Sequence, residues 1–197
     1  MPWDDAPDLR GAELIHDRRA IERALDRMAA EITEDLGGRN PLILGVMIGG
    51  MIPAGRLLPR LEFPLEVDYV HATRYRNELS GQDLVWHALP TTPMEGRDLL
   101  IVDDILDEGH TLAGIIEAFR NGGARSVRTA VLVDKRHDRK FEGLCADYVG
   151  LEVEDRYVFG AGMDCRGLGR NADGIYAIDA RTEQAARSQQ EPDTEER

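Results

Sequence analysis

Apolar residues recur every three, four or seven positions near the start of the chain. They are Leu14, Ile21, Leu25, Met28, Ile32 and Leu36. This spacing places their side chains on one face of a helix. Two glycines, Gly37 and Gly38, follow as a stop signal. The pattern therefore predicts an amphipathic helix over residues 14–36.

After this helix, short apolar runs alternate with helical segments. The apolar runs predict strands at 42–48, 65–72, 84–90, 98–106 and 126–135. Helices are expected at 53–61 and 111–123, the second ending in two glycines. Because strands and helices alternate, we expect an α/β fold, a doubly wound and mainly parallel sheet flanked by helices. No repeat or linker divides residues 11–180, which predicts a single domain.

Three segments lack this pattern. Residues 73–83 are polar and not periodic, and a connection of this length is typical of a functional loop, so we expect a mobile loop there. Residues 1–10 and 181–197 carry few apolar side chains. We therefore expect a flexible N-terminus and a disordered acidic tail.

Composition and charge narrow the classes of function. The 197 residues carry a formal net charge of -13, whereas a protein that neutralises nucleic-acid phosphates needs clustered Lys and Arg. No apolar run approaches the roughly 20 residues of a membrane span. The two cysteines form no CxxC pair, the five histidines show no zinc-ligand spacing, and no signal peptide is visible. We expect a cytoplasmic protein that acts on a small molecule, with no nucleic-acid or membrane partner.

Carboxylates stand at the end of one buried strand. Asp103, Asp104 and Asp107 fall at its carboxyl end, where open parallel sheets bind ligands. Gly109 and Thr111 then begin a helix, whose free N–H groups favour phosphate. Adjacent carboxylates suit sugar hydroxyls, but Asp residues after a strand are also common turn formers, so both interpretations stay open. A P-loop nucleotidase is excluded because no GxxxxGK[ST] occurs.

Four separated segments resemble one known family. The segment IVDDILDEGHT (101–111) resembles the ribose-5-phosphate signature of the type I phosphoribosyltransferases. The segments MIGG (47–50), VLVDKRHD (131–138) and DRYVFGAGMD (155–164) extend the resemblance to the hypoxanthine-guanine branch. The resemblance implies that fold, with a small hood region. It also implies transfer of ribose 5-phosphate from phosphoribosyl pyrophosphate to a 6-oxopurine, giving IMP or GMP.

The resemblance assigns roles in binding the sugar and its phosphate. Asp103 and Asp104 would hold the ribose hydroxyls, partly through magnesium, and Asp107 would be catalytic by handling the proton on the purine N7. The 5'-phosphate would lie against the loop of Asp107, Glu108, Gly109, His110 and Thr111. The resemblance gives the His110 side chain no role of its own.

Further roles follow for the base and the leaving group. The pyrophosphate would contact Ile48, Gly49 and Arg170, and the purine would contact Lys135, Tyr157 and Val158. A lysine at this position donates to the purine O6 and so selects 6-oxopurines. Asp164 would serve the metal, and the mobile loop would close as a lid through Arg74 and Tyr75. The turn at 47–50 would contain a cis peptide.

Three positions depart from the family pattern. Glu108 stands where members commonly have Thr, Ile48 stands where they often have Lys, and Arg74 replaces the small hydroxyl residue before Tyr75. An acidic side chain beside a phosphate is unfavourable unless it points outward. The contact at Glu108 is therefore expected to come mainly from the backbone.

The resemblance also implies a cofactor, substrates and an assembly. We expect Mg²⁺ bridging pyrophosphate oxygens and carboxylates, with phosphoribosyl pyrophosphate and 6-oxopurine bases as partners of a homodimer or homotetramer. An adenine or pyrimidine enzyme would share residues 101–111 but not Lys135 together with Tyr157 and Asp164. A nucleotide-sensing regulator with the same fold and an enzyme for xanthine remain alternatives.

Overall fold

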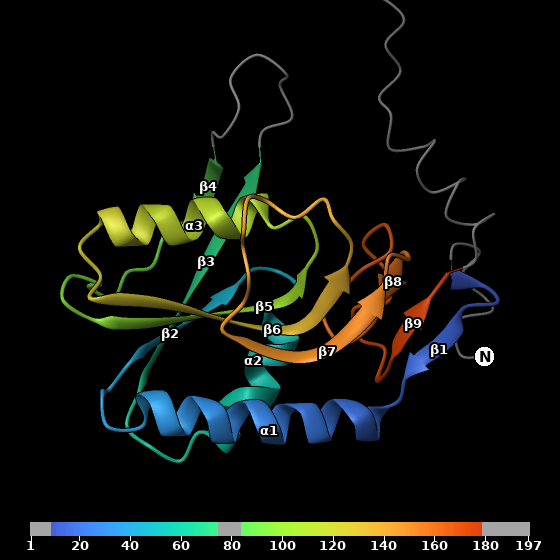
Figure 1. Ribbon diagram of the computed structural model, residues 1–197, viewed down its shortest axis with the longest axis horizontal. Coiled ribbons are helices and arrows are strands. Elements are labelled where there is room, and N and C mark those ends of the chain that lie inside the picture. Colours follow the sequence, from blue (N-terminus) through green and yellow to red (C-terminus); the bar gives the residue numbers. More distant parts are fainter. Residues whose placement is uncertain (1–8, 75–83, 179–197) are drawn as a thin grey trace, which may run out of the picture.

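A six-stranded sheet forms the centre of the computed structural model, which describes residues 9–74 and 84–178. Its strands are β2 (Leu42–Val46), β3 (Glu66–Arg74), β4 (Leu84–Ala88), β5 (Asp98–Leu106), β6 (Ser126–Arg136) and β7 (Tyr148–Glu154). Their order is β4-β3-β2-β5-β6-β7, and every neighbouring pair is parallel except β3 with the edge strand β4. The predicted doubly wound, mainly parallel sheet is confirmed (Figure 1).

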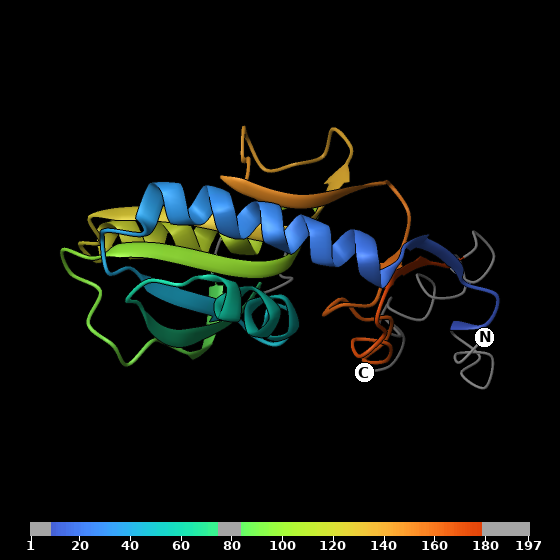
Figure 2. The same cartoon turned by 90° about the horizontal axis from the view of Figure 1, so that it is seen from below.

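Helices cover both faces of this sheet. Helix α3 (His110–Asn121) lies on one face, and α1 (Arg18–Leu36) and α2 (Met51–Leu57) lie on the other (Figures 1 and 2). The face under α1 buries the periodic side chains Ile21, Leu25, Met28, Ile32 and Leu36. The opposite face buries Leu112, Ile115, Ile116 and Phe119 of α3. Burial of these apolar faces on the sheet is the main stabilising contribution to the arrangement.

The first helix begins four residues later than its periodicity predicts. Asp17 caps it, because its carboxylate accepts a hydrogen bond from the Ala20 N–H at 2.8 Å. The residues before the cap form a strand, β1 (Glu13–His16), in which Leu14 is 45% exposed. The prediction that Leu14 belongs to the helix is therefore wrong, because its backbone pairs in a sheet instead.

The other predicted helices differ only at their ends. Helix α2 begins at Met51 instead of residue 53, and a short 3-10 helix, η2 (Leu58–Arg60), completes the segment. Helix α3 begins one residue before and ends two residues before the predicted bounds.

A small second sheet stands beside the carboxyl ends of the main strands (Figure 1). It contains β1, β8 (Val158–Phe159) and β9 (Ile175–Ala177) in the antiparallel order β1-β9-β8. It has its own apolar cluster, which includes Leu9, Phe159, Cys165 and Ile178. This sheet is the small hood region that the resemblance implies. Its strands were not predicted, because elements of two to four residues are too short for a periodicity of two to show.

Some predictions fall on parts of the chain outside the described residues. These are most of the N-terminal segment 1–10, the mobile loop 73–83 beyond Arg74, and the tail 181–197. They stay predictions, as does the single domain over residues 11–180. Over the described ranges, no helix is long and apolar enough to cross a membrane.

Candidate active site

One cavity collects the site residues that the sequence predicts. It has a volume of about 1170 Å³, and many of its lining residues lie at the carboxyl ends of β2, β5 and β6 and at the start of β8 in the small sheet. Its lining includes Ile48, Gly49, Arg74, Asp103, Asp104, Asp107, Glu108, Gly109, His110, Thr111, Lys135, Tyr157, Val158, Asp164 and Arg170. The remaining predicted residue, Tyr75, lies outside the described residues. The segments meet because parallel pairing aligns the ends of neighbouring strands at one edge.

Two adjacent carboxylates line this cavity. Asp103 and Asp104 lie in the second half of β5, where Asp103 Oδ1 accepts from the Asp104 N–H at 2.9 Å and Asp104 Oδ1 accepts from the Ile105 N–H at 2.8 Å. Burial raises the pKa of Asp103 well above its ordinary value, and repulsion from Asp104 adds to the effect. Burial also raises the pKa of Asp104. A cation or a hydrogen-bond donor in the cavity would stabilise the ionised pair.

The turn after β2 packs its backbone against this pair. The Met47–Ile48 peptide bond is cis, as the resemblance implies for this turn. Gly49 follows without space for a side chain, since a Cβ atom there would lie 2.0 Å from Asp104 Oδ2. The Ile48 side chain is about half exposed at the rim of the cavity. Only glycine therefore lets the backbone of this turn approach the carboxylate.

Gly49→Ala is expected to raise KM for phosphoribosyl pyrophosphate about tenfold, which corresponds to about 1.4 kcal/mol. The added methyl group must displace Asp104 or the turn itself. Initial rates at varied phosphoribosyl pyrophosphate test this expectation. Gly55→Ala is the matched control, because Gly55 lies in α2 with nothing within 4 Å of an added Cβ atom. An unchanged KM in the Gly49 variant would contradict the close approach.

The loop between β5 and α3 presents backbone groups to the cavity. Gly109 stands at the N-terminus of α3 with a φ of 80°. Because no side chain caps this end of the helix, its first N–H groups are available to an anion. The Glu108 side chain is 53% exposed and lies 3.7 Å from His110 Nε2. The acidic group that departs from the family pattern is thus largely in solvent, which fits the expected backbone contact.

Asp107 follows β5 directly and has a partner on each oxygen. Lys135 Nζ donates to its Oδ2 at 2.5 Å, and His137 Nε2 lies 2.7 Å from its Oδ1. Burial by itself would raise the pKa of Asp107, but the hydrogen bonds of Lys135 and His137 and the charge of Lys135 outweigh it and lower the pKa. The carboxylate is therefore ionised at neutral pH and able to accept a proton.

A second group of charges closes the cavity on the side of the small sheet. The Arg170 guanidinium pairs with Asp164, donates to the Gly162 carbonyl at 2.6 Å and lies 3.8 Å from Asp104 Oδ2. Asp164 also accepts from the Gly167 N–H at 2.7 Å. These contacts hold the positively charged guanidinium of Arg170 next to the buried carboxylates of β5.

Three residues of this region, Arg139, Asp155 and His137, were not predicted from the sequence. Arg139 and Asp155 line the cavity and form a paired contact at 2.7 and 2.9 Å. His137 is almost fully buried against Asp107. A period-two extension of β6 past Lys135 places His137 on the same side of the chain, and this was the available signal.

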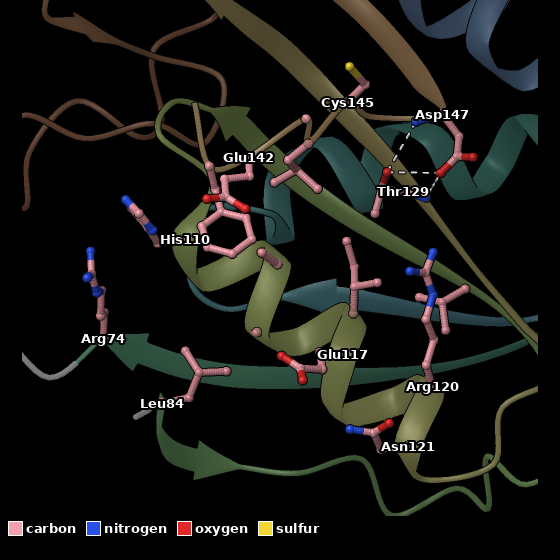
Figure 3. Close-up of a pocket in the computed structure, with 17 residues that line it drawn as sticks. Arg74, Leu84, His110, Glu117, Arg120, Asn121, Thr129, Glu142, Cys145 and Asp147 are labelled. Carbon is pink, nitrogen blue, oxygen red and sulfur yellow. Dashed lines mark hydrogen bonds between the residues drawn. The ribbon is translucent and has the colours of Figure 1, made fainter. Parts of the chain in front are cut away.

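A second, smaller cavity of about 500 Å³ runs along α3 (Figure 3). Of the predicted site residues, only Arg74 and His110 line it. Its Thr129 and Asp147 bond to each other, with the Thr129 N–H donating to Asp147 Oδ2 at 2.8 Å. Most of the predicted site residues therefore line the larger cavity instead.

A doubly wound sheet with its cavity at the carboxyl ends of the strands defines a class of α/β proteins that bind ligands at that edge. Within this class the chain belongs to the phosphoribosyltransferase family. The family model described as "Phosphoribosyl transferase domain" matches residues 11–166.

Named relatives confirm the resemblance to the hypoxanthine-guanine branch. The chain is 36% identical over 146 residues to the hypoxanthine-guanine phosphoribosyltransferase of Bacillus subtilis, covering 73% of this chain and 80% of that protein. It is 31% identical over 158 residues to the hypoxanthine-guanine-xanthine phosphoribosyltransferase of Tritrichomonas foetus, covering 80% and 86%. A crystal structure of a hypoxanthine phosphoribosyltransferase from Staphylococcus aureus superposes with a TM-score of 0.81 at 26% identity, covering 86% and 92%.

Proposed function

We propose that this chain is a purine-salvage enzyme that transfers ribose 5-phosphate from phosphoribosyl pyrophosphate to N9 of hypoxanthine or guanine. The products are IMP or GMP and pyrophosphate. The observation that carries the proposal is the single cavity in which four separated segments meet. Relatives named for this activity support the choice of bases.

The sugar and the phosphate are assigned to the β5 strand and the loop after it. Asp103 and Asp104 accept hydrogen bonds from the ribose hydroxyls. The 5'-phosphate binds the N–H groups from Glu108 to Thr111 at the start of α3, where the positive end of the helix dipole lies. Arg170, which lines the same cavity, contacts the pyrophosphate.

The base is assigned to residues at the carboxyl end of β6 and around the start of β8. Tyr157 stacks on the purine ring, Val158 borders it, and Lys135 donates to O6. Adenine presents an amine at the same position, which cannot accept from the Lys135 ammonium. Asp107 takes the proton from N7 as N9 bonds to the sugar carbon and the bond to pyrophosphate breaks. Its negative charge also stabilises the cationic sugar of the transition state.

Magnesium is the proposed cofactor. Asp103 and Asp104 fit a hard cation, because burial raises the pKa of both carboxyl groups, repulsion from Asp104 adds to the effect on Asp103, and a cation would favour the ionised forms. Asp164 is the third proposed carboxylate. Among the described residues, no group of three or more His, Cys, Asp or Glu side chains is arranged to hold a metal ion, so these carboxylates would hold magnesium only together with substrate oxygens and water. When bound, magnesium neutralises charge on the leaving pyrophosphate.

Nucleotide formation from one panel of bases tests the function. The protein is incubated with phosphoribosyl pyrophosphate, magnesium and hypoxanthine, guanine, xanthine, adenine or uracil, and products are separated by chromatography. IMP and GMP are expected, with no product from adenine or uracil. Product from xanthine would widen the range of substrates, as the name of the Tritrichomonas foetus relative suggests.

The same assay separates the enzyme from the regulator alternative. No product with any base would contradict the proposed activity and favour a nucleotide-sensing protein of the same fold. The homodimer or homotetramer and the cytoplasmic location stay predictions.

A further inference from the structure

His137 has a buried side chain next to Asp107, and the proposed function gives it no role. Its side chain is 2% exposed, and its Nε2 atom lies 2.7 Å from Asp107 Oδ1. It follows the last residue of β6 and stands two positions beyond Lys135. This polar ring is nearly removed from water and directly contacts Asp107, the residue proposed to accept the N7 proton.

The hydrogen bonds of the ring fix the position of its proton. The backbone N–H of Arg139 donates to His137 Nδ1 at 3.1 Å. A nitrogen that accepts a hydrogen bond carries no proton, so the ring proton is on Nε2. His137 therefore donates from Nε2 to Asp107 Oδ1. The Arg139 guanidinium is paired with Asp155, which anchors the segment that holds the ring.

The two partners of Asp107 differ in their freedom to move. Lys135 reaches Oδ2 through a flexible four-carbon stem, and in the proposed reaction its ammonium turns to the purine O6. His137 is held by the Arg139 N–H and by burial, and it has no such second partner in the proposed reaction. When Lys135 turns away, Oδ2 becomes available while Oδ1 stays bound.

We infer that His137 is a positioning residue that holds Asp107 by Oδ1 so that Oδ2 faces N7 of the base. This inference rests on the proposed function. In the step it serves, the N9 lone pair forms the bond to the sugar carbon and pyrophosphate departs with the electrons of its C–O bond. The N7 proton passes to Asp107 Oδ2 and from there to solvent. His137 keeps its own proton throughout.

The test compares two substitutions of His137 in the full chain with magnesium present. His137→Leu removes the donor, and His137→Gln keeps an N–H donor that can reach the place of Nε2. His137→Leu is expected to lower kcat by about 10- to 150-fold, the loss that corresponds to one hydrogen bond to a charged group. KM for phosphoribosyl pyrophosphate is expected to stay within about twofold, and His137→Gln should recover most of kcat.

Two controls separate positioning from a merely structural role. Arg136→Gln changes the neighbouring residue, which is exposed and pairs with Glu152, and it should leave kcat unchanged. In an Asp107→Asn background, His137→Leu should lower kcat no further, because the group that it positions is already lost. If His137→Leu lowers kcat only by destabilising the fold, the loss also appears in the Asp107→Asn background, whereas a loss of positioning does not.

The outcomes distinguish this inference from the function on which it rests. A wild-type protein that forms no nucleotide overturns both. Wild-type turnover together with an unchanged kcat in His137→Leu overturns the role of His137 alone. Equal loss in the Leu and Gln variants, or an additive loss in the double variant, also overturns it.

Discussion

Asp107→Asn is expected to lower kcat for IMP formation by about 100- to 10,000-fold, the range of a lost general base. The amide has nearly the same shape but cannot accept the N7 proton, and it has no charge to stabilise the cationic sugar. Binding of phosphoribosyl pyrophosphate depends mainly on other groups of the cavity. Its KM should therefore change little, and initial rates at varied substrate measure both quantities.

Asp138 provides a matched control for the Asp107 substitution. Asp138→Asn makes the same chemical change at an exposed position on the segment after β6, and it should leave kcat and KM unaltered. Equal losses in kcat and in affinity for phosphoribosyl pyrophosphate would show that Asp107 binds substrate instead of handling a proton. The two hydrogen bonds from Lys135 and His137 to Asp107 would then serve the binding of phosphoribosyl pyrophosphate.

Lys135→Met is expected to lower kcat/KM for hypoxanthine and guanine by about 10- to 150-fold. This range corresponds to the 1.5–3 kcal/mol of a hydrogen bond to a charged donor. Methionine keeps most of the length and apolar stem of Lys135, which is buried at the end of β6, but it cannot donate to the purine O6. Discrimination against adenine should shrink for the same reason. Steady-state kinetics with the three bases measures both effects.

The chain offers a second lysine as the control for this change. Lys140 is partly buried and pairs with Asp134, so Lys140→Met removes a similar charge from the same region. It should change kcat/KM by less than about twofold. Unchanged use of 6-oxopurines in Lys135→Met would remove the assignment of Lys135 to O6, and its pairing with Asp107 would be its main role.

Much of the fold follows from local patterns. The bounds of β5 match the prediction, because the strand contains an unbroken apolar run at 99–102, begins at the polar Asp98 and ends at Leu106 before Asp107. The start of α1 was misplaced, because the apolar spacing continues back through Leu14 into a strand that Asp17 separates from the helix. The strand β7 was not predicted, although its sequence YVGLEVE is apolar enough to suggest one. Periodicity alone does not reveal which segments find a neighbour in a sheet.

The composition of the candidate site was also predictable in part. Asp103, Asp104 and Lys135 were expected from motifs, and the cavity contains all three. His137 was passed over because a histidine two residues after a lysine has no motif of its own. The Glu108 side chain could be interpreted only when its exposure was known.

The sequence by itself determined which elements form and which chemical groups each motif carries, because helix and strand periods and turn residues act over a few neighbouring positions. Only the tertiary structure decided which atoms meet. The two hydrogen bonds on Asp107 join residues 28 and 30 positions apart. They exist because β5 and β6 pair in parallel with one register. A shift of that register would move Lys135 and His137 away from the carboxylate, so the pairing of strands fixes the proposed chemistry.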